Sequence, residues 1–208
     1  MKHMKTRLHT TLWTGLVAAA LLAPGLASGV GLTVEGFYGL TRPPDTKISN
    51  ALEDRNIFDD SLQLAGGDVL IRFGVLELGA IADVNWGDDT ATQSAIGGLA
   101  GIALPLGPAR LDLLGEIGGQ RYGNLAKNPN LAGNDTGDKW LAYVGLRPGL
   151  AFKVGGTGPG LLVGIWTFAR WDLQKEDVRV TLAGGGGEGD YELGGVTLGA
   201  TLRVGVDF

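Results

Sequence analysis

The chain has 208 residues, of which 37 are glycine and none is cysteine, and its formal net charge is −5. Hydrophobic residues make up 44% of the chain and follow a pattern, which excludes a disordered protein, and the glycines follow no collagen period. An acidic chain without a basic patch argues against nucleic acid as a partner, and the lack of cysteine leaves stability to non-covalent contacts.

The first 27 residues have the composition of a cleaved secretory signal peptide. Three basic residues begin it, an apolar stretch from Leu12 to Leu22 follows, and small residues precede a cleavage site after Ala27. A membrane anchor is the alternative, but the apolar stretch is shorter than the roughly 20 residues that span a bilayer. We therefore predict an exported protein with a signal peptide at residues 1–27 and one domain at residues 28–208.

The rest of the chain predicts strands, because apolar residues recur at every second position. The seven strands expected first lie at about residues 32–40, 68–75, 78–86, 96–104, 109–120, 140–153 and 161–171. Residues 96–104 are mostly glycine and alanine, so their facing stays open. Residues 161–171 are apolar at both parities, and Arg170 indicates that Trp166 and Phe168 share its polar face.

The last expected strand, at residues 196–208, is the most regular one. Every even position from Val196 to Phe208 is apolar, and every odd position is polar or glycine. At 13 residues it is about twice the usual strand length of five or six. Such a strand has one apolar face and one polar face.

The connections between these strands alternate in length. Short ones are expected at about 75–77, 105–108 and 155–160, and long polar ones at about 41–63, 87–94, 122–139 and 172–191. An outer-membrane barrel has short periplasmic turns and longer extracellular loops. The sequence therefore predicts an all-β fold, an eight-stranded antiparallel up-and-down transmembrane β-barrel with both ends in the periplasm.

Two patterns favour a membrane barrel over a soluble, lipocalin-like periplasmic barrel that binds a ligand. The charged residues of the strands share one parity with glycine, as expected of a narrow polar interior. The aromatic residues of the apolar faces are expected to form two girdles, one beside the long loops and one at the opposite ends. The girdle residues are Tyr38, Trp86, Trp140 and Trp171 on the loop side, and Phe73, Phe152 and Phe208 on the other.

The alternating tail from Leu202 to the terminal Phe208 resembles that of small outer-membrane barrels of the OmpA transmembrane-domain, OmpX and OmpW kind. The resemblance implies a location in the outer membrane of a Gram-negative bacterium. In that group the terminal strand is the signal that the barrel-assembly machinery reads. The resemblance assigns this role to Leu202, Val204, Val206 and Phe208.

The composition of residues 28–208 argues against an enzyme. Both histidines, His3 and His9, lie in the predicted signal peptide, so the remaining chain has neither histidine nor cysteine. Nucleophilic sites of the Ser-His-Asp and Cys-His kinds are thereby excluded, as are the usual zinc sites. Only carboxylates remain for acid–base chemistry. We expect no catalytic residue, no cofactor and no metal.

The charged residues of the inward parity predict a salt-bridge network instead. The interior of an eight-stranded barrel is just wide enough to be filled by side chains, and buried charges must be paired. The expected network sets four acids against four arginines: Glu35, Asp83, Asp112 and Glu116 against Arg72, Arg110, Arg147 and Arg203. Such a network is a plug or a gate, with Arg72 and Arg147 as candidate gating residues.

The favoured function is a surface, structural or limited small-solute passage role. The expected partners are outer-membrane lipid, lipopolysaccharide and the assembly machinery, and the chain is expected to be a monomer. The acidic loops are interpreted as solvated, although Ca²⁺ could bridge them to lipopolysaccharide phosphates. The alternative is an OmpW-like conduit for small apolar molecules. It would be lined by Phe37, Leu70, Ile81, Leu114, Trp166 and Phe168.

Overall fold

The protein is described by a computed structural model at residues 30–44, 48–49, 61–87, 91–123, 138–155, 158–181 and 188–208. Among these residues, no helix has the length and apolar character needed to cross a membrane. The predicted signal peptide, most of the loops at 41–63 and 122–139, and residues 88–90 of the loop at 87–94 lie outside the described residues, together with most of the acidic side chains of these three loops.

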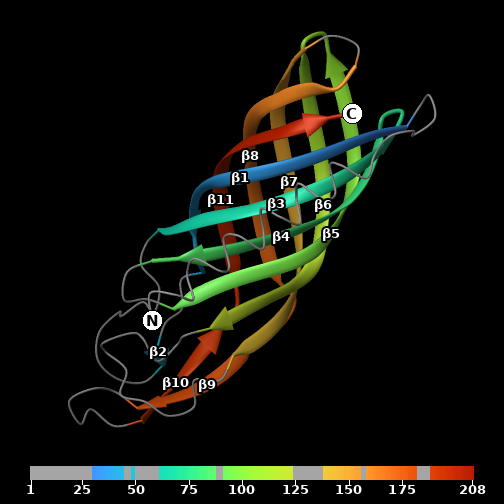
Figure 1. Ribbon diagram of the computed structural model, residues 1–208. Helices are drawn as coiled ribbons and strands as arrows, with labels where there is room; N and C mark the ends of the chain where they lie inside the picture. The colour runs from blue at the N-terminus through green and yellow to red at the C-terminus, as the bar shows by residue number, and fades with distance from the viewer. Residues whose placement is uncertain are drawn as a thin grey trace.

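Eight strands form one closed antiparallel barrel (Figure 1). They are β1 (Val30–Arg42), β3 (Leu62–Phe73), β4 (Leu76–Trp86), β5 (Thr92–Leu106), β6 (Ala109–Gly123), β7 (Lys139–Val154), β8 (Gly160–Asp172) and β11 (Val196–Asp207). Each strand pairs with the strands before and after it in this order, and β11 closes the barrel against β1. The predicted eight-stranded up-and-down architecture is confirmed.

The alternation of each strand sorts its side chains between the outside and the lumen. On β11, Leu202 is 67% exposed, whereas its neighbour Arg203 is fully buried inside. On β5, whose facing the sequence left open, Ile96 points outward and Leu99 is buried in the lumen. The exterior is apolar and the interior holds the charges, which is the reverse of a soluble barrel. This is the arrangement of a membrane-spanning barrel.

Short turns lie at one end of the barrel, which we call the turn end, and the longer connections lie at the opposite loop end. Gly74 and Gly107 occupy two of the turns with positive φ values of 65° and 69°, a conformation that favours glycine. The first turn is shorter than predicted, because Leu76 and Glu77 already belong to β4. Extended pairing with β3 draws both residues into the sheet.

A second, three-stranded sheet lies beyond the loop end, away from the C-terminus (Figure 1). It consists of β2 (Ile48–Ser49), β9 (Glu176–Thr181) and β10 (Glu188–Leu193), and β10 pairs with both of the others. The sequence predicted only polar loops at 41–63 and 172–191. Two loops that are distant in the chain thus share this sheet, which we call the loop sheet.

Candidate functional site: the barrel lumen

Four of the predicted network residues form an ion-pair group on the turn side of the lumen. Arg203 Nη2 lies 2.5 Å from Asp112 Oδ2, and its Nη1 lies 3.4 Å from Glu35 Oε2. Arg110 Nε lies 2.7 Å from Asp112 Oδ1. Trp166 Nε1 donates a hydrogen bond of 3.1 Å to Glu35. These contacts join four strands, β1, β6, β8 and β11, across the lumen.

A second group lies at the rim of the turn end, around the carboxylate of Asp207. Lys153 Nζ lies 2.8 Å from this carboxylate, Arg72 forms an ion pair with it, and the Thr33 hydroxyl donates to it at 2.9 Å. Arg72 Nε also lies 3.6 Å from Glu77 Oε1. The predicted network residue Arg72 therefore belongs to this rim, where it is partly exposed.

A third group lies on the loop side of the lumen and has Arg170 at its centre. Arg170 Nε donates to Glu116 Oε1 at 2.9 Å, and its terminal nitrogens pair with both oxygens of Asp83. The Tyr143 hydroxyl donates to Glu116 at 2.5 Å. Two of the predicted acids, Asp83 and Glu116, thus pair with an arginine that was not included in the predicted network.

Between the Arg203 group and the Arg170 group, the lumen holds a cluster of buried apolar side chains, and we call this part the waist. Its apolar cluster consists of Phe37, Leu64, Leu70, Ile81, Leu99, Leu114, Trp166 and Phe168. The predicted network residue Arg147 is fully buried among them, with its Nη2 3.6 Å from Asp68 Oδ2. The predicted single network of four acids and four arginines is therefore divided by the waist.

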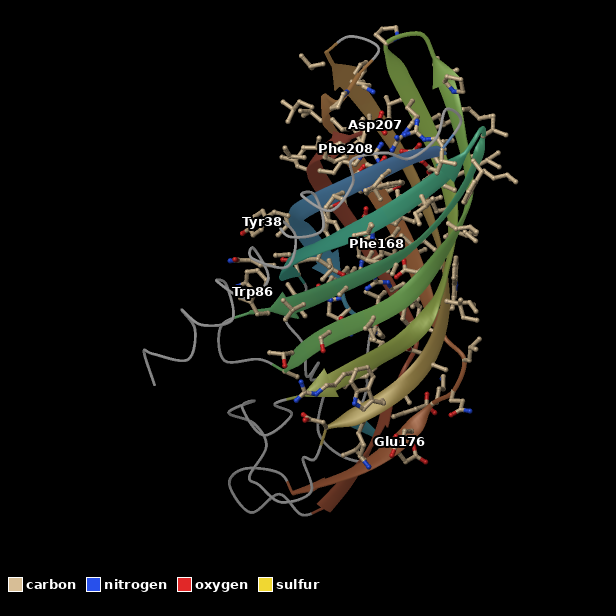
Figure 2. The ribbon with its side chains drawn as sticks, turned by 45° about the vertical axis from the view of Figure 1, so that its right-hand side comes forward. Tyr38, Trp86, Phe168, Glu176, Asp207 and Phe208 are labelled. Carbon is tan, nitrogen blue, oxygen red and sulfur yellow. The ribbon has the colours of Figure 1, made fainter. Side chains whose placement is uncertain are left out.

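Arginines and aromatic rings alternate along the lumen through the waist. In order, they are Arg203, Trp166, Arg147, Phe168, Arg170 and Tyr143. At each step the arginine Cζ lies between 4.0 and 6.0 Å from the ring centroid, within the range of cation–π attraction. Figure 2 shows Phe168 inside the barrel, between Asp207 at the turn end and Glu176 at the loop end.

Glycines make room for the two largest rings of this column. A Cβ atom at Gly149 would lie 2.1 Å from the Trp166 ring, and one at Gly199 would lie 2.2 Å from the Phe168 ring. Real Cβ atoms do not approach so closely, so the rings lie directly on the bare backbone of β7 and β11. The glycine content of these strands thus serves the packing of the lumen.

Five charged members of these groups were absent from the predicted network: Asp68, Glu77, Lys153, Arg170 and Asp207. Asp68, Lys153, Arg170 and Asp207 have the inward parity, so the alternation of their strands already carried the signal. Glu77 was missed because it was assigned to a turn. The carboxylates of all three groups lie beside arginines, and among the described residues no group of three His, Cys, Asp or Glu could hold a metal ion.

The predicted girdle residues lie on the outer surface near the strand ends. Tyr38, Trp140 and Trp171 are exposed toward the loop end, where Trp86 ends β4, and the Tyr38 and Trp86 rings are 6.3 Å apart (Figure 2). Phe73 and Phe152 are exposed near the turn end, and Phe208 follows β11 there.

The residues of the predicted assembly signal lie along the outer face of β11 and just beyond it. Leu202, Val204 and Val206 are exposed. The Phe208 amide donates to the Leu32 carbonyl at 2.8 Å, so β1 and the chain end are paired to the last residue.

Comparison with known proteins identifies similar folds among solved structures. The chain is similar to Neisserial surface protein A (12% identity, TM-score 0.47, covering 86% of this chain and 99% of the other). It is also similar to the N-terminal β-barrel domain of Pseudomonas aeruginosa OprF (11%, 0.40, 83% and 96%) and to Ail, the attachment invasion locus protein of Yersinia pestis (10%, 0.39, 84% and 98%). No protein-family model and no curated protein matches the sequence.

Proposed function

We propose that the protein is a structural surface barrel of a Gram-negative outer membrane, with a closed lumen and with its loop end outside the cell. The observation that carries this proposal is the filled lumen, in which side chains as large as Trp166, Arg147, Arg170 and Arg203 are fully buried. A lumen occupied by its own side chains offers no free path to solutes. The apolar exterior and the loop end remain for contacts with other molecules.

The partners in this proposal follow from the surfaces that the barrel leaves accessible. Lipid and lipopolysaccharide surround the apolar exterior, and the assembly machinery reads the outer face of β11 after export through the signal peptide. Within the closed barrel no strand edge is free to pair with a second copy, which supports a monomer. Exposed pairs such as Lys175–Glu192 near the loop sheet offer both charges to surface ligands.

Conduction of small apolar molecules finds less support in this arrangement. The six residues that would line such a conduit are buried against one another in the waist cluster, together with Leu64 and Leu99. They fill the space that a conduit would need. Passage of a solute would therefore require displacement of these side chains.

Recordings from planar bilayers test the closed lumen. The purified wild-type barrel is expected to give no steady openings, because the waist is packed with apolar side chains. Replacing Trp166 and Phe168 together by alanine is expected to produce openings. Trp140→Ala, which removes a ring from the outer surface, is the matched control and is expected to stay silent. Steady openings of nanosiemens size in the wild type contradict the proposal.

The location is tested separately by cell fractionation with gel mobility before and after heating. We expect the wild-type chain in the outer-membrane fraction, with faster migration when it is not heated. Recovery in the soluble periplasmic fraction contradicts the membrane location.

A further inference from the structure

The three arginines of the lumen column are held in different ways. Arg203 forms a 2.5 Å ion pair with Asp112, and Arg170 donates hydrogen bonds to Glu116 and Asp83. Arg147, between them, has no hydrogen-bond partner at Nε, Nη1 or Nη2, although it is fully buried. Its guanidinium is therefore fixed by something other than hydrogen bonds.

Aromatic rings surround the Arg147 guanidinium. Its Cζ lies 4.4 Å from the centroid of Phe37, 4.9 Å from that of Trp166 and 6.0 Å from that of Phe168. A planar cation is attracted to the faces of such rings, and the attraction grows where water is excluded. These three rings form an aromatic cage, and Arg147 fills it.

Asp68 supplies the counter-charge of the cage without binding its occupant tightly. Its carboxylate is fully buried, 3.6 Å from Arg147 Nη2, and neither of its oxygens has a hydrogen-bond partner. Charge attraction thus stabilises the Arg147–Asp68 pair, but no directional hydrogen bond fixes the orientation of the guanidinium. A flat cation of the same size and charge would meet the same surroundings.

The barrel wall beside the cage is also weaker than elsewhere. Between β7 and β8 the pairing runs from Tyr143 to Leu146 and resumes at Gly149, so it skips Arg147 and Pro148. Pro148 has no amide hydrogen to give to the ladder. Among the described barrel strands, this is the one interruption inside a paired range. The backbone next to Arg147 therefore lacks regular pairing with β8.

We propose that the waist is a binding site for a planar guanidinium-type cation, occupied by the side chain of Arg147, and that this occupancy locks the lumen. The lock depends on stacking in the aromatic cage rather than on a salt bridge. The proposal rests on the closed lumen proposed above. It further specifies that a free guanidinium ion takes the place of the side chain when Arg147 is removed.

The test compares Arg147→Ala and Arg147→Lys with the wild type in planar bilayers. Both variants are expected to open, because alanine empties the cage and an ammonium group cannot fill it as a flat group does. Millimolar guanidinium chloride is expected to reduce the open probability of Arg147→Ala at least tenfold, whereas equal sodium chloride has no effect. Arg121→Ala removes an exposed arginine near the loop end and is expected to remain closed like the wild type.

The outcomes separate this proposal from the closed lumen itself. Steady openings of the wild type overturn the closed lumen, whereas a folded Arg147→Ala that stays closed overturns only the lock. An Arg147→Lys variant that stays closed contradicts the claim that stacking of a planar group closes the lumen. Openings that guanidinium does not block overturn the cation site.

A thermal measurement keeps the test independent of conductance. Millimolar guanidinium is expected to raise the Tm of refolded Arg147→Ala above its value in equal sodium chloride, with no such rise for the wild type. Equal Tm values in the two salts contradict the cation site. If Arg147→Ala does not refold, the open or closed state of Arg147→Lys decides the proposal.

Discussion

At the scale of single residues, the glycines of this barrel divide into two kinds. An inward glycine such as Gly149 lies directly beneath an aromatic ring, and a side chain at that point would overlap the ring. An outward glycine such as Gly98 has no atom closer than 3.9 Å to the place of a Cβ. Only the first kind is required by the packing of the lumen.

Gly149→Ala is therefore expected to destabilise the barrel. The new methyl group displaces the Trp166 ring from its position 2.1 Å away, and overpacking of this kind costs about 1–3 kcal/mol. The free energy of unfolding, measured by urea titration in lipid vesicles, is expected to fall by that amount. Gly98→Ala serves as the control and is expected to leave it unchanged. Equal effects of the two substitutions contradict the close approach.

At the scale of the strands, β7 combines length with a defect. It has 16 residues, and Pro148 lies in its middle, where a missing amide interrupts the ladder to β8. The Thr167 hydroxyl donates to the Pro148 carbonyl at 3.4 Å, which leaves a weak link in place of a regular pair. This position is at the level of the waist, because Arg147 precedes it.

Pro148→Val is expected to repair this pairing. Restoring the amide adds one backbone hydrogen bond, which is worth about 0.5–1.5 kcal/mol. Slower hydrogen exchange of the β8 amides around Thr167 is the expected readout, together with a higher urea midpoint. Leu150→Val, on the same strand and parity, changes a side chain without adding a donor and is expected not to slow that exchange. An unchanged exchange rate in Pro148→Val contradicts the proposed defect.

The strands also show how far the sequence could predict the fold. β11 was predicted almost to its ends, because its even positions are apolar and its odd positions are not. The facing of β5 could not be predicted from its glycines and alanines, which fit either side. The loop sheet could not be predicted either, since Ile48–Ser49 is too short to show a period and its partner Asp190 lies far along the chain.

The sequence predicted which residues face the lumen, but not which of them contact one another. Parity alone placed residues such as Arg203 and Asp83 on the inward faces. Which of them meet depends on the stagger of the strands around the barrel, which no single strand encodes. Arg203 therefore meets Asp112, 91 residues away, and Asp83 meets Arg170, 87 residues away. The division of the charges by the waist follows from that stagger.

At the scale of the whole molecule, the barrel is an inverted protein whose apolar side chains face outward. A soluble barrel would expose charges at positions such as Leu202, which lies in the middle of β11 and is 67% exposed. A band of this kind is stable only in hydrocarbon. The energetic effect of a charge on this surface should then depend on its depth in the membrane.

Arginine substitutions on β11 test this dependence. Leu202→Arg, near the middle of the strand, is expected to lower the free energy of unfolding in lipid by about 2–4 kcal/mol. Val196→Arg, at the loop-end start of the same face, is expected to cost about 0–1 kcal/mol, because its charge reaches the interface. Urea titrations in lipid vesicles measure both. Equal, small costs contradict burial of the middle of β11 in the membrane.

The pairing of β1 with β11 determines when the barrel can close during folding. The side chains of Thr33 and Asp207, which are bonded to each other, are 174 positions apart. Until β11 has been synthesised and delivered, β1 and β8 each present an unsatisfied row of backbone donors and acceptors that can recruit strands of other molecules. Contacts so distant in the chain also form slowly. The barrel can therefore close only once its final strand is available, and until then the edges of β1 and β8 stay open.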